Sequence, residues 1–232
     1  MQSAPLHPAE SDRLEALLKY EILDSSDEEV FDELTQLASE ICGTSISLIS
    51  LVDADRQWFK SRVGLDAPET ERSIAFCSHA ILQDEIFEIE DAEQDARFHD
   101  NPLVTGAPDI RFYAGKPLVT QEGMPIGTLC VIDQEPRKLT DFQKRALNTL
   151  SKQIISQLEI RLDARKKERM AKEREKIYSV LAHDLRSPFN GILNLSKIMS
   201  EHAETLTPAK LKEMATHILD SSITLYQVMD EL

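Results

Sequence analysis

The sequence predicts an α+β protein in which helices flank an antiparallel sheet, followed by a long coiled-coil helix that leads into a helical hairpin. Three observations carry this prediction. Between residues 46 and 132, short segments of alternating apolar residues lie among segments of helical spacing. From residue 139 to about 204, only Pro188 interrupts a helical pattern. A second apolar helical stripe follows Thr207.

The first 24 residues are predicted to form a helical N-terminal extension. Its apolar positions recur at helical spacing: Leu14, Leu17, Leu18 and Ile22. A second helix is expected from about 27 to 41, where Gly43 supplies a C-terminal stop. Residues 46–52 then form a strand buried on both faces, and 57–63 form the return strand of a hairpin.

The middle of the chain is expected to complete the sheet. Residues 74–82 form a short helical piece, and residues 86–90 form another strand. The polar segment 91–108 contains Gly and Pro and is predicted to be a long loop that carries function. Strands at 111–119 and 126–132 follow, and the next helix opens at residue 139.

The composition indicates a folded protein of one large domain or two smaller ones. The 232 residues are 41% hydrophobic and 29% charged, with a formal net charge of −15. Such an acidic chain is repelled by phosphate backbones, which excludes nucleic acid as a general partner.

The cysteines and the hydropathy pattern indicate a cytoplasmic protein without a membrane span. The three cysteines are far apart in no metal-ligand spacing, and no secretory signal precedes them. This pattern fits a reducing compartment. The longest uncharged hydrophobic stretch, from 41 to 52, is too short to cross a bilayer.

Four segments of the predicted sheet region carry a family resemblance. They are Phe76 to Ile81 (FCSHAI), Arg97 to Pro102, Ile110 to Gly115 (IRFYAG) and Gly127 to Asp133 (GTLCVID). With them, residues 25–158 resemble a GAF domain, a small-molecule-sensing relative of PAS domains. The resemblance implies the fold and a sensory role, and it leaves the ligand unknown because one fold hosts many functions.

The candidate pocket of this domain consists of aromatic, basic and thiol side chains: Trp58, Phe76, Cys77, His79, Arg111, Tyr113 and Cys130. Aromatic residues of this kind are more often simple core residues. Cys77 beside His79 leaves bilin attachment, redox sensing and metal sensing as alternatives. A bilin is disfavoured because the expected cysteine–histidine dipeptide is absent. A small buried cysteine is the commoner case, and no metal site is predicted.

Residues 159–176 are predicted to be a coiled-coil signalling linker. The register is mostly apolar, with two basic exceptions: Ile160, Ala164, Lys167, Ala171, Arg174, Tyr178, Leu181 and Leu185. It suggests a parallel two-stranded coiled coil and therefore a homodimer. A weak seam suits a helix that switches between two packings, and the alternative is a solvated linker helix.

Residues 177–232 contain the segment richest in chemistry, LAHDLRSPFN. It places an imidazole, a carboxylate, a guanidinium and a hydroxyl close to a proline: His183, Asp184, Arg186, Ser187 and Pro188. The segment resembles the H-box of the HisKA dimerisation and histidine phosphotransfer domain of sensor histidine kinases. The bland alternative is a surface histidine in a helical bundle with a proline bend.

The resemblance implies a role for each residue of the H-box. His183 would be the phosphoacceptor that attacks the γ-phosphoryl group of ATP, and Asp184 would be the general base that fixes its tautomer. Arg186 would interact with phosphate. Ser187 would position water for dephosphorylation of a regulator, and Pro188 would bend the helix by leaving the Asp184 carbonyl without a donor.

The predicted function is the sensory and phosphoacceptor portion of a cytoplasmic two-component sensor histidine kinase. An intracellular signal sensed by the GAF domain would control autophosphorylation of His183 and phosphotransfer to an aspartate in a response regulator receiver domain. A homodimer is expected through the coiled coil and a four-helix bundle.

No cofactor is expected in this chain. ATP and Mg would bind in a catalytic domain beyond Leu232, where the last helix is expected to be incomplete. The alternative function is a non-enzymatic dimerising signalling or scaffold module with a GAF ligand-binding domain.

Overall fold

The computed structural model describes residues 1–202 and 204–230, except for the side chains of residues 179–184. Its contacts divide the chain into two compact units, Met1–Ala164 and Arg165–Leu232. The two units are described separately.

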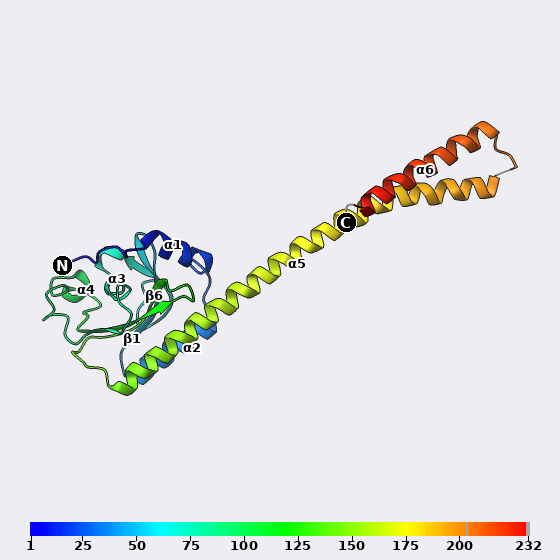
Figure 1. The fold of residues 1–232 in the computed structure, drawn as a ribbon. Coiled ribbons are helices and arrows are strands. Elements are labelled where there is room, and N and C mark those ends of the chain that lie inside the picture. The colour runs from blue at the N-terminus through cyan, green and yellow to red at the C-terminus, as the bar shows by residue number, and fades with distance from the viewer. Residues whose placement is uncertain (203, 231–232) are drawn as a thin grey trace. The chain divides into compact units, whose positions relative to one another are not determined.

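A six-stranded antiparallel sheet forms the centre of the first unit (Figure 1). Its spatial order is β3-β2-β1-β6-β5-β4. The strands are β1 (Ile46–Val52), β2 (Arg56–Val63), β3 (Glu69–Glu71), β4 (Phe87–Ile89), β5 (Phe112–Val119) and β6 (Pro125–Asp133). Every residue of the central strands β1 and β6 is buried, because other elements cover the sheet on both faces.

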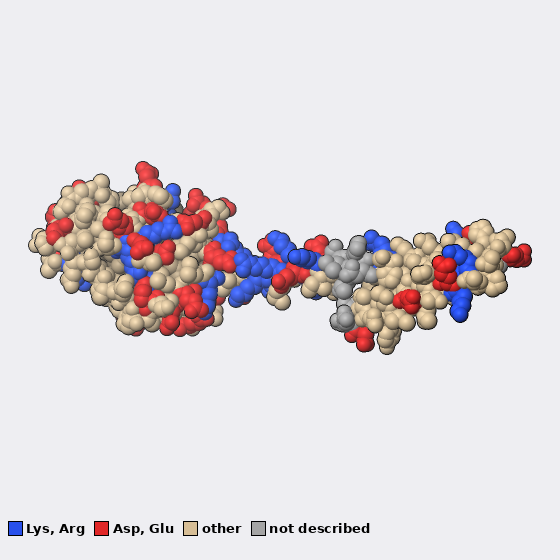
Figure 2. All heavy atoms as spheres, turned by 90° about the horizontal axis from the view of Figure 1, so that it is seen from above, with Lys and Arg blue, Asp and Glu red and all other residues tan. Residues whose placement is uncertain are grey.

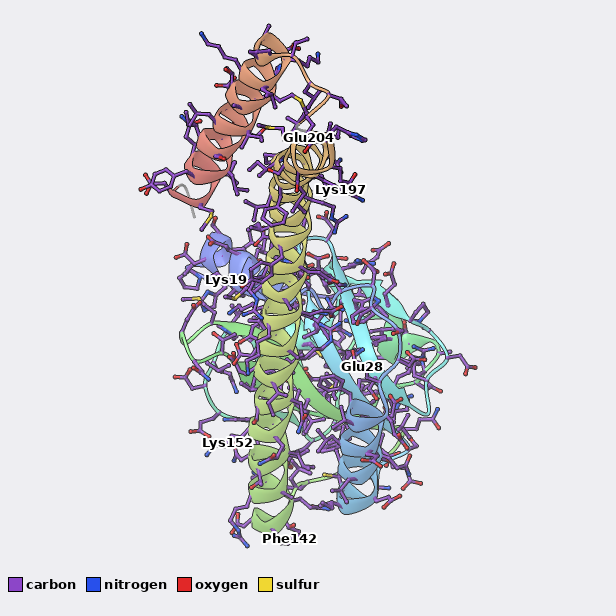
Figure 3. The ribbon with its side chains drawn as sticks, turned by 90° about the vertical axis from the view of Figure 1, so that its right-hand side faces the viewer. Lys19, Glu28, Phe142, Lys152, Lys197 and Glu204 are labelled. Atoms are coloured by element: carbon purple, nitrogen blue, oxygen red, sulfur yellow. The ribbon has the colours of Figure 1, made fainter. Side chains whose placement is uncertain are left out.

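Two hydrophobic layers cover the sheet. On one face lie α1 (Glu10–Lys19), α2 (Glu29–Cys42) and the start of α5 (Asp141–His202), which bury Leu17, Phe31 and Ile154 against the strands. The other face is covered by α3 (Phe76–Ala80), α4 (Pro102–Thr105) and the loops around them. Figure 3 shows α2 and α5 side by side, with Phe142 at the start of α5.

The prediction of an α+β fold with an antiparallel sheet, a long helix and a helical hairpin is confirmed. Two segments outside the predicted helices and strands contain further elements. Residues 69–71 pair with β2 as β3 and continue into a 3-10 turn, η1 (Arg72–Ile74). In the 91–108 segment, α4 forms because Asn101 accepts a hydrogen bond from the Leu103 backbone N–H and Pro102 takes the first helical position.

The start of α5 lies two residues later than the sequence predicts. Thr140 and Gln143 form a capping box, in which the Thr140 N–H donates to Gln143 Oε1 at 2.9 Å. The Gln143 N–H donates in return to Thr140 Oγ1 at 3.3 Å. This reciprocal cap makes Asp141 the first helical residue.

The second unit consists of the remainder of α5 and the antiparallel helix α6 (Pro208–Asp230). α5 continues as a helix through Pro188. Thr207 caps α6 by accepting a hydrogen bond from the Lys210 N–H, and Pro208 occupies the first position. α5 and α6 lie close together at Gly191. A Cβ atom added to this glycine would lie 3.4 Å from Ser221 Oγ of α6. Among the described residues, no helix has the length and apolar character needed to cross a membrane.

Candidate functional site

A cavity of about 400 Å³ lies on the α3–α4 face of the sheet. Apolar side chains form most of its wall, including Leu48, Phe59, Leu103 and Ile132. They come from the central strands and from the loops on either side of the cavity. A larger depression of about 670 Å³ between β5 and α5 has charged walls, including Lys116, Lys152 and Asp163. Small-molecule sites are mostly apolar with a few placed polar groups, which favours the smaller cavity.

Two buried polar atoms distinguish the smaller cavity. Gln57 and Thr70 face each other across the β2–β3 pair, and both line its wall. Within the described residues, Gln57 Oε1 and Thr70 Oγ1 have no hydrogen-bond partner. A buried polar atom without a partner costs about 1–3 kcal/mol, so a bound polar group would stabilise this arrangement.

None of the seven candidate pocket residues lines this cavity. Trp58 lies on the opposite face of the sheet, in the layer beneath α2 and α5. Its neighbours Gln57 and Phe59 point to the cavity, since successive side chains of a strand alternate between faces. The alternation of residues along the sequence predicts such a strand, but it does not indicate which face of the strand borders a cavity.

Five of the candidate residues form one packed cluster between α3 and the sheet: Phe76, Cys77 and His79 of α3, Tyr113 of β5 and Cys130 of β6. The Phe76 ring stacks on Phe98 with centroids 4.0 Å apart. Tyr113 Oη donates to Cys77 Sγ at 3.2 Å, and Cys77 Sγ lies 3.8 Å from Cys130 Sγ. The aromatic rings and thiols of this cluster pack against one another.

Two polar candidates, His79 of this cluster and the remaining residue Arg111, brace neighbouring loops. The His79 ring Nε2 pairs with the Gln2 carbonyl at 3.1 Å, and burial lowers the pKa of this imidazole. Arg111 Nη1 donates to the carbonyls of Val104 and Ile110 at 3.0 and 3.2 Å. Arg111 therefore holds α4 against the end of the sheet.

Electrostatics distinguishes the three thiols. Burial opposes ionisation of Cys77, but the surrounding thiol and hydroxyl groups, Cys130 first among them, outweigh it and hold its pKa below the usual value. The pKa of Cys130 is raised by its hydrogen bond to Cys77 and by burial. Burial also raises the pKa of Cys42 to about 11. Cys77 is therefore the thiol whose ionised form is most favoured.

A group of ion pairs and hydrogen bonds, called here the ionic junction, holds α5 against other elements of the first unit. Its side chains are those of Tyr20, Glu28, Lys60, Glu159 and Arg161. Glu28, which Figure 3 labels, accepts through Oε1 from Lys60 Nζ at 2.8 Å and from Arg161 Nε at 2.9 Å. Arg161 also donates to the Tyr20 carbonyl at 3.0 Å, and Tyr20 Oη donates to Glu159 at 2.6 Å. This junction joins β2, the segment before α2 and α5. Sequence reasoning missed it because its members are far apart in the chain.

The H-box lies within α5. The side chains of Arg186 and Ser187 are exposed, and Pro188 is half-buried. The side chains of His183 and Asp184 lie outside the described residues. Figure 2 shows Lys and Arg side chains gathered along the part of α5 that precedes the H-box.

Solved structures resemble this chain in fold. A domain assigned to a two-component sensor histidine kinase protein from Sinorhizobium meliloti 1021 is 19% identical, with a TM-score of 0.48, over 63% of this chain and 99% of that one. A bacteriophytochrome from R. palustris is 12% identical, with a TM-score of 0.54, over 78% of this chain and 43% of that one. The bacteriophytochrome match supports a shared fold and nothing finer.

A curated relative and a family model each match part of this chain. A cyclic di-GMP phosphodiesterase from Pseudomonas aeruginosa is 51% identical over 116 residues, which are 50% of this chain. The matched part is 20% of that protein, so this chain corresponds to only a fraction of the relative's length. The family model described as GAF domain matches residues 27–162. Since that match covers more than half of the chain, this protein belongs to the GAF domain family.

Proposed function

We propose that this protein is the sensory and phosphoacceptor portion of a two-component sensor histidine kinase. The GAF domain is a sensory signalling domain, and its state would control phosphorylation of His183 and transfer to an aspartate of a response regulator receiver domain. The observation that carries the proposal is that a single helix, α5, packs on the sensory sheet at its start and contains the HDLRSP sequence further along.

The helical hairpin supports a homodimer. Large apolar side chains of α5 and α6 are at least 42% exposed: Phe189, Leu193, Ile198, Leu219, Ile223, Tyr226 and Met229. Exposed apolar surface of this extent favours association with another apolar face. Two such hairpins would bury it as a four-helix bundle around the H-box, which is the expected setting of a histidine phosphotransfer site.

The chemistry follows from the types of residue in the H-box. A neutral His183 imidazole would attack the γ-phosphoryl group of ATP, and Asp184 would stabilise the charge that develops on the ring. Arg186 would bind phosphate, and Ser187, one helical turn beyond His183, would orient water in the reverse, phosphatase direction. ATP and Mg would be held by a catalytic domain outside this chain.

The ionic junction around Glu28 supports the coupling step. Arg161 ties α5 to the backbone of residues 20 and 21, and Glu28 ties it to Lys60 of β2. A ligand that shifts β2 in the cavity would therefore change the contacts that hold α5. A contact that can change in this way is the kind of element that can bias a signalling helix.

The resemblance to the cyclic di-GMP phosphodiesterase concerns the sensory part alone. The identity covers 20% of that protein, and it supports a related sensory domain. The second candidate function is a non-enzymatic dimerising module, favoured by the exposed apolar hairpin, in which His183 serves as a docking surface.

A phosphorylation assay separates the two functions. The chain is incubated with labelled ATP and a separately expressed ATP-binding domain of a histidine kinase. We expect acid-labile label on the wild type and on His202→Gln, a control on the same helix, and none on His183→Gln. Circular dichroism would verify that both variants fold. Absence of label on the wild type, or label retained by His183→Gln, would refute the phosphoacceptor role.

A further inference from the structure

We propose that Cys77 and Cys130 form a reversible disulfide inside the GAF domain when the protein meets a hydroperoxide. The function proposed above uses neither thiol. Their sulfur atoms are 3.8 Å apart, and both residues are at most 1% exposed. The pair therefore lies in the interior of the sensory domain, and neither cysteine lines its cavity.

The two cysteines come from different elements. Cys130 lies in the middle of the central strand β6, between Leu48 of β1 and Gly115 of β5. Cys77 belongs to α3, a helix of five residues that packs on the sheet. A disulfide needs sulfur atoms about 2.05 Å apart, so rotation of the thiols with a small shift of α3 would close the bond.

Three hydroxyl groups favour ionisation of Cys77. Tyr113 Oη donates to its sulfur at 3.2 Å. Ser50 and Thr128 are cross-strand neighbours, and their buried hydroxyls have no partner within the described part of the chain. A thiolate at Cys77 would give these hydroxyls an acceptor, which is why they lower the pKa of this thiol.

Gly115 makes the tyrosine contact possible. A Cβ atom at this position would lie only 2.2 Å from Tyr113 Oη, so the tyrosine ring occupies the space above the glycine. Because Tyr113 and Gly115 are two residues apart on β5, they share one face of the sheet. A side chain at Gly115 would push the hydroxyl away from Cys77.

The reaction balances with a hydroperoxide as the oxidant. The Cys77 thiolate attacks one peroxide oxygen, which breaks the O–O bond and releases an alkoxide or hydroxide that is then protonated. The resulting Cys77 sulfenic acid is attacked by the Cys130 sulfur, and the S–S bond forms as water leaves with the Cys130 proton. Two thiols lose two electrons and the hydroperoxide gains them. A dithiol reductant reverses the change.

Cys42 provides an internal control. It lies on α2 at the opposite face of the sheet, in the layer with Trp58 rather than with the cluster. Burial raises its pKa to about 11 and makes its thiolate scarce near neutral pH. The proposal therefore predicts that Cys42 stays reduced under conditions that oxidise the pair.

Mass spectrometry of the whole chain tests the disulfide. The protein is treated with hydrogen peroxide, denatured with a thiol-blocking reagent, and analysed intact and after non-reducing digestion. We expect the loss of two hydrogens, a peptide linking Cys77 to Cys130, and one blocked thiol at Cys42. Cys42→Ser should keep this bond, whereas Cys77→Ser and Cys130→Ser should lose it.

The wild-type digest decides the proposal even where a serine variant fails to fold. Three blocked thiols, a linkage through Cys42, or sulfinic acid at Cys77 without a linkage would each overturn it.

A kinetic test addresses the positioning groups. Tyr113→Phe and Gly115→Ala should slow disulfide formation about tenfold near neutral pH, because each removes one hydrogen bond to the thiolate. The midpoint of the rate against pH should also move to higher pH, a change that a merely structural role would not produce. Unaltered rates and midpoints in both variants would overturn the assigned role of the hydroxyl.

Discussion

Replacing Glu28 by Gln should lower the free energy of unfolding of the first unit by more than is usual for a partly exposed residue. Lys60 is only 1% exposed, and its ammonium group donates to Glu28 and to two neutral acceptors, Ser25 Oγ and the Ser26 carbonyl. Glutamine keeps the shape of the side chain and removes the negative charge. The buried Lys60 charge would then have only neutral partners.

The magnitude follows from the burial of the pair. Removing one partner of a fully buried ion pair costs about 3–5 kcal/mol. The Glu28 side chain is 33% exposed, so solvent screening reduces the expected loss to about 2 kcal/mol. For a unit of this size, that loss lowers the melting temperature by about 4–8 °C.

Differential scanning calorimetry of the chain would measure this effect. Glu29→Gln is the matched control, since it removes the same charge from the adjacent, exposed residue. Lys60→Met in the Glu28→Gln background should recover much of the loss, because it removes the buried charge that the first change left without a counter-charge. If Glu28→Gln and Glu29→Gln have the same melting temperature, the assigned role of the junction is wrong.

Two other predictions concern the pH dependence of stability and the cavity. Arg13 and Arg72 overcome the effect of burial and lower the pKa of Glu10 from 4.5 to about 2, so its stabilisation is complete above pH 4.5 and lost as the pH falls toward 2. The unfolding free energies of wild type and Glu10→Gln, measured by urea denaturation, should therefore converge over this range; a constant difference would contradict the ion pair. Gln57→Leu should raise the melting temperature of the ligand-free protein. It removes the buried Oε1 atom, whose missing hydrogen bond costs the folded state about 1–3 kcal/mol. A lower melting temperature would show that this atom has a partner in solution.

Local patterns predict most elements of the fold. The alternation in 46–52 and 126–132 indicates strands, and the structure shows why the first has no polar face: both sides of β1 are covered. Gly43 ends α2 in the left-handed conformation, as expected for a glycine at this position. These features depend on residues close in sequence, where period and turn chemistry are informative.

Long-range contacts were beyond the same reasoning. β3 is only three residues long and is defined by its pairing with β2 rather than by a pattern. Glu28 and Arg161 meet across 133 residues. The choice of Trp58 over Gln57 as a pocket residue shows the same limit, because period alone does not say which face of a strand meets open space. His183 stays a prediction from its motif.

The lengths of the outermost strands have a consequence for how copies of this protein can meet. β3 and β4 form the two edges of the sheet, and each has only three residues. A strand from another molecule would gain few backbone hydrogen bonds at either edge, so strand addition is disfavoured. The sensory domain is thereby protected from sheet-to-sheet aggregation, and pairing of copies is left to helical surfaces, where it can be reversed without unfolding the domain.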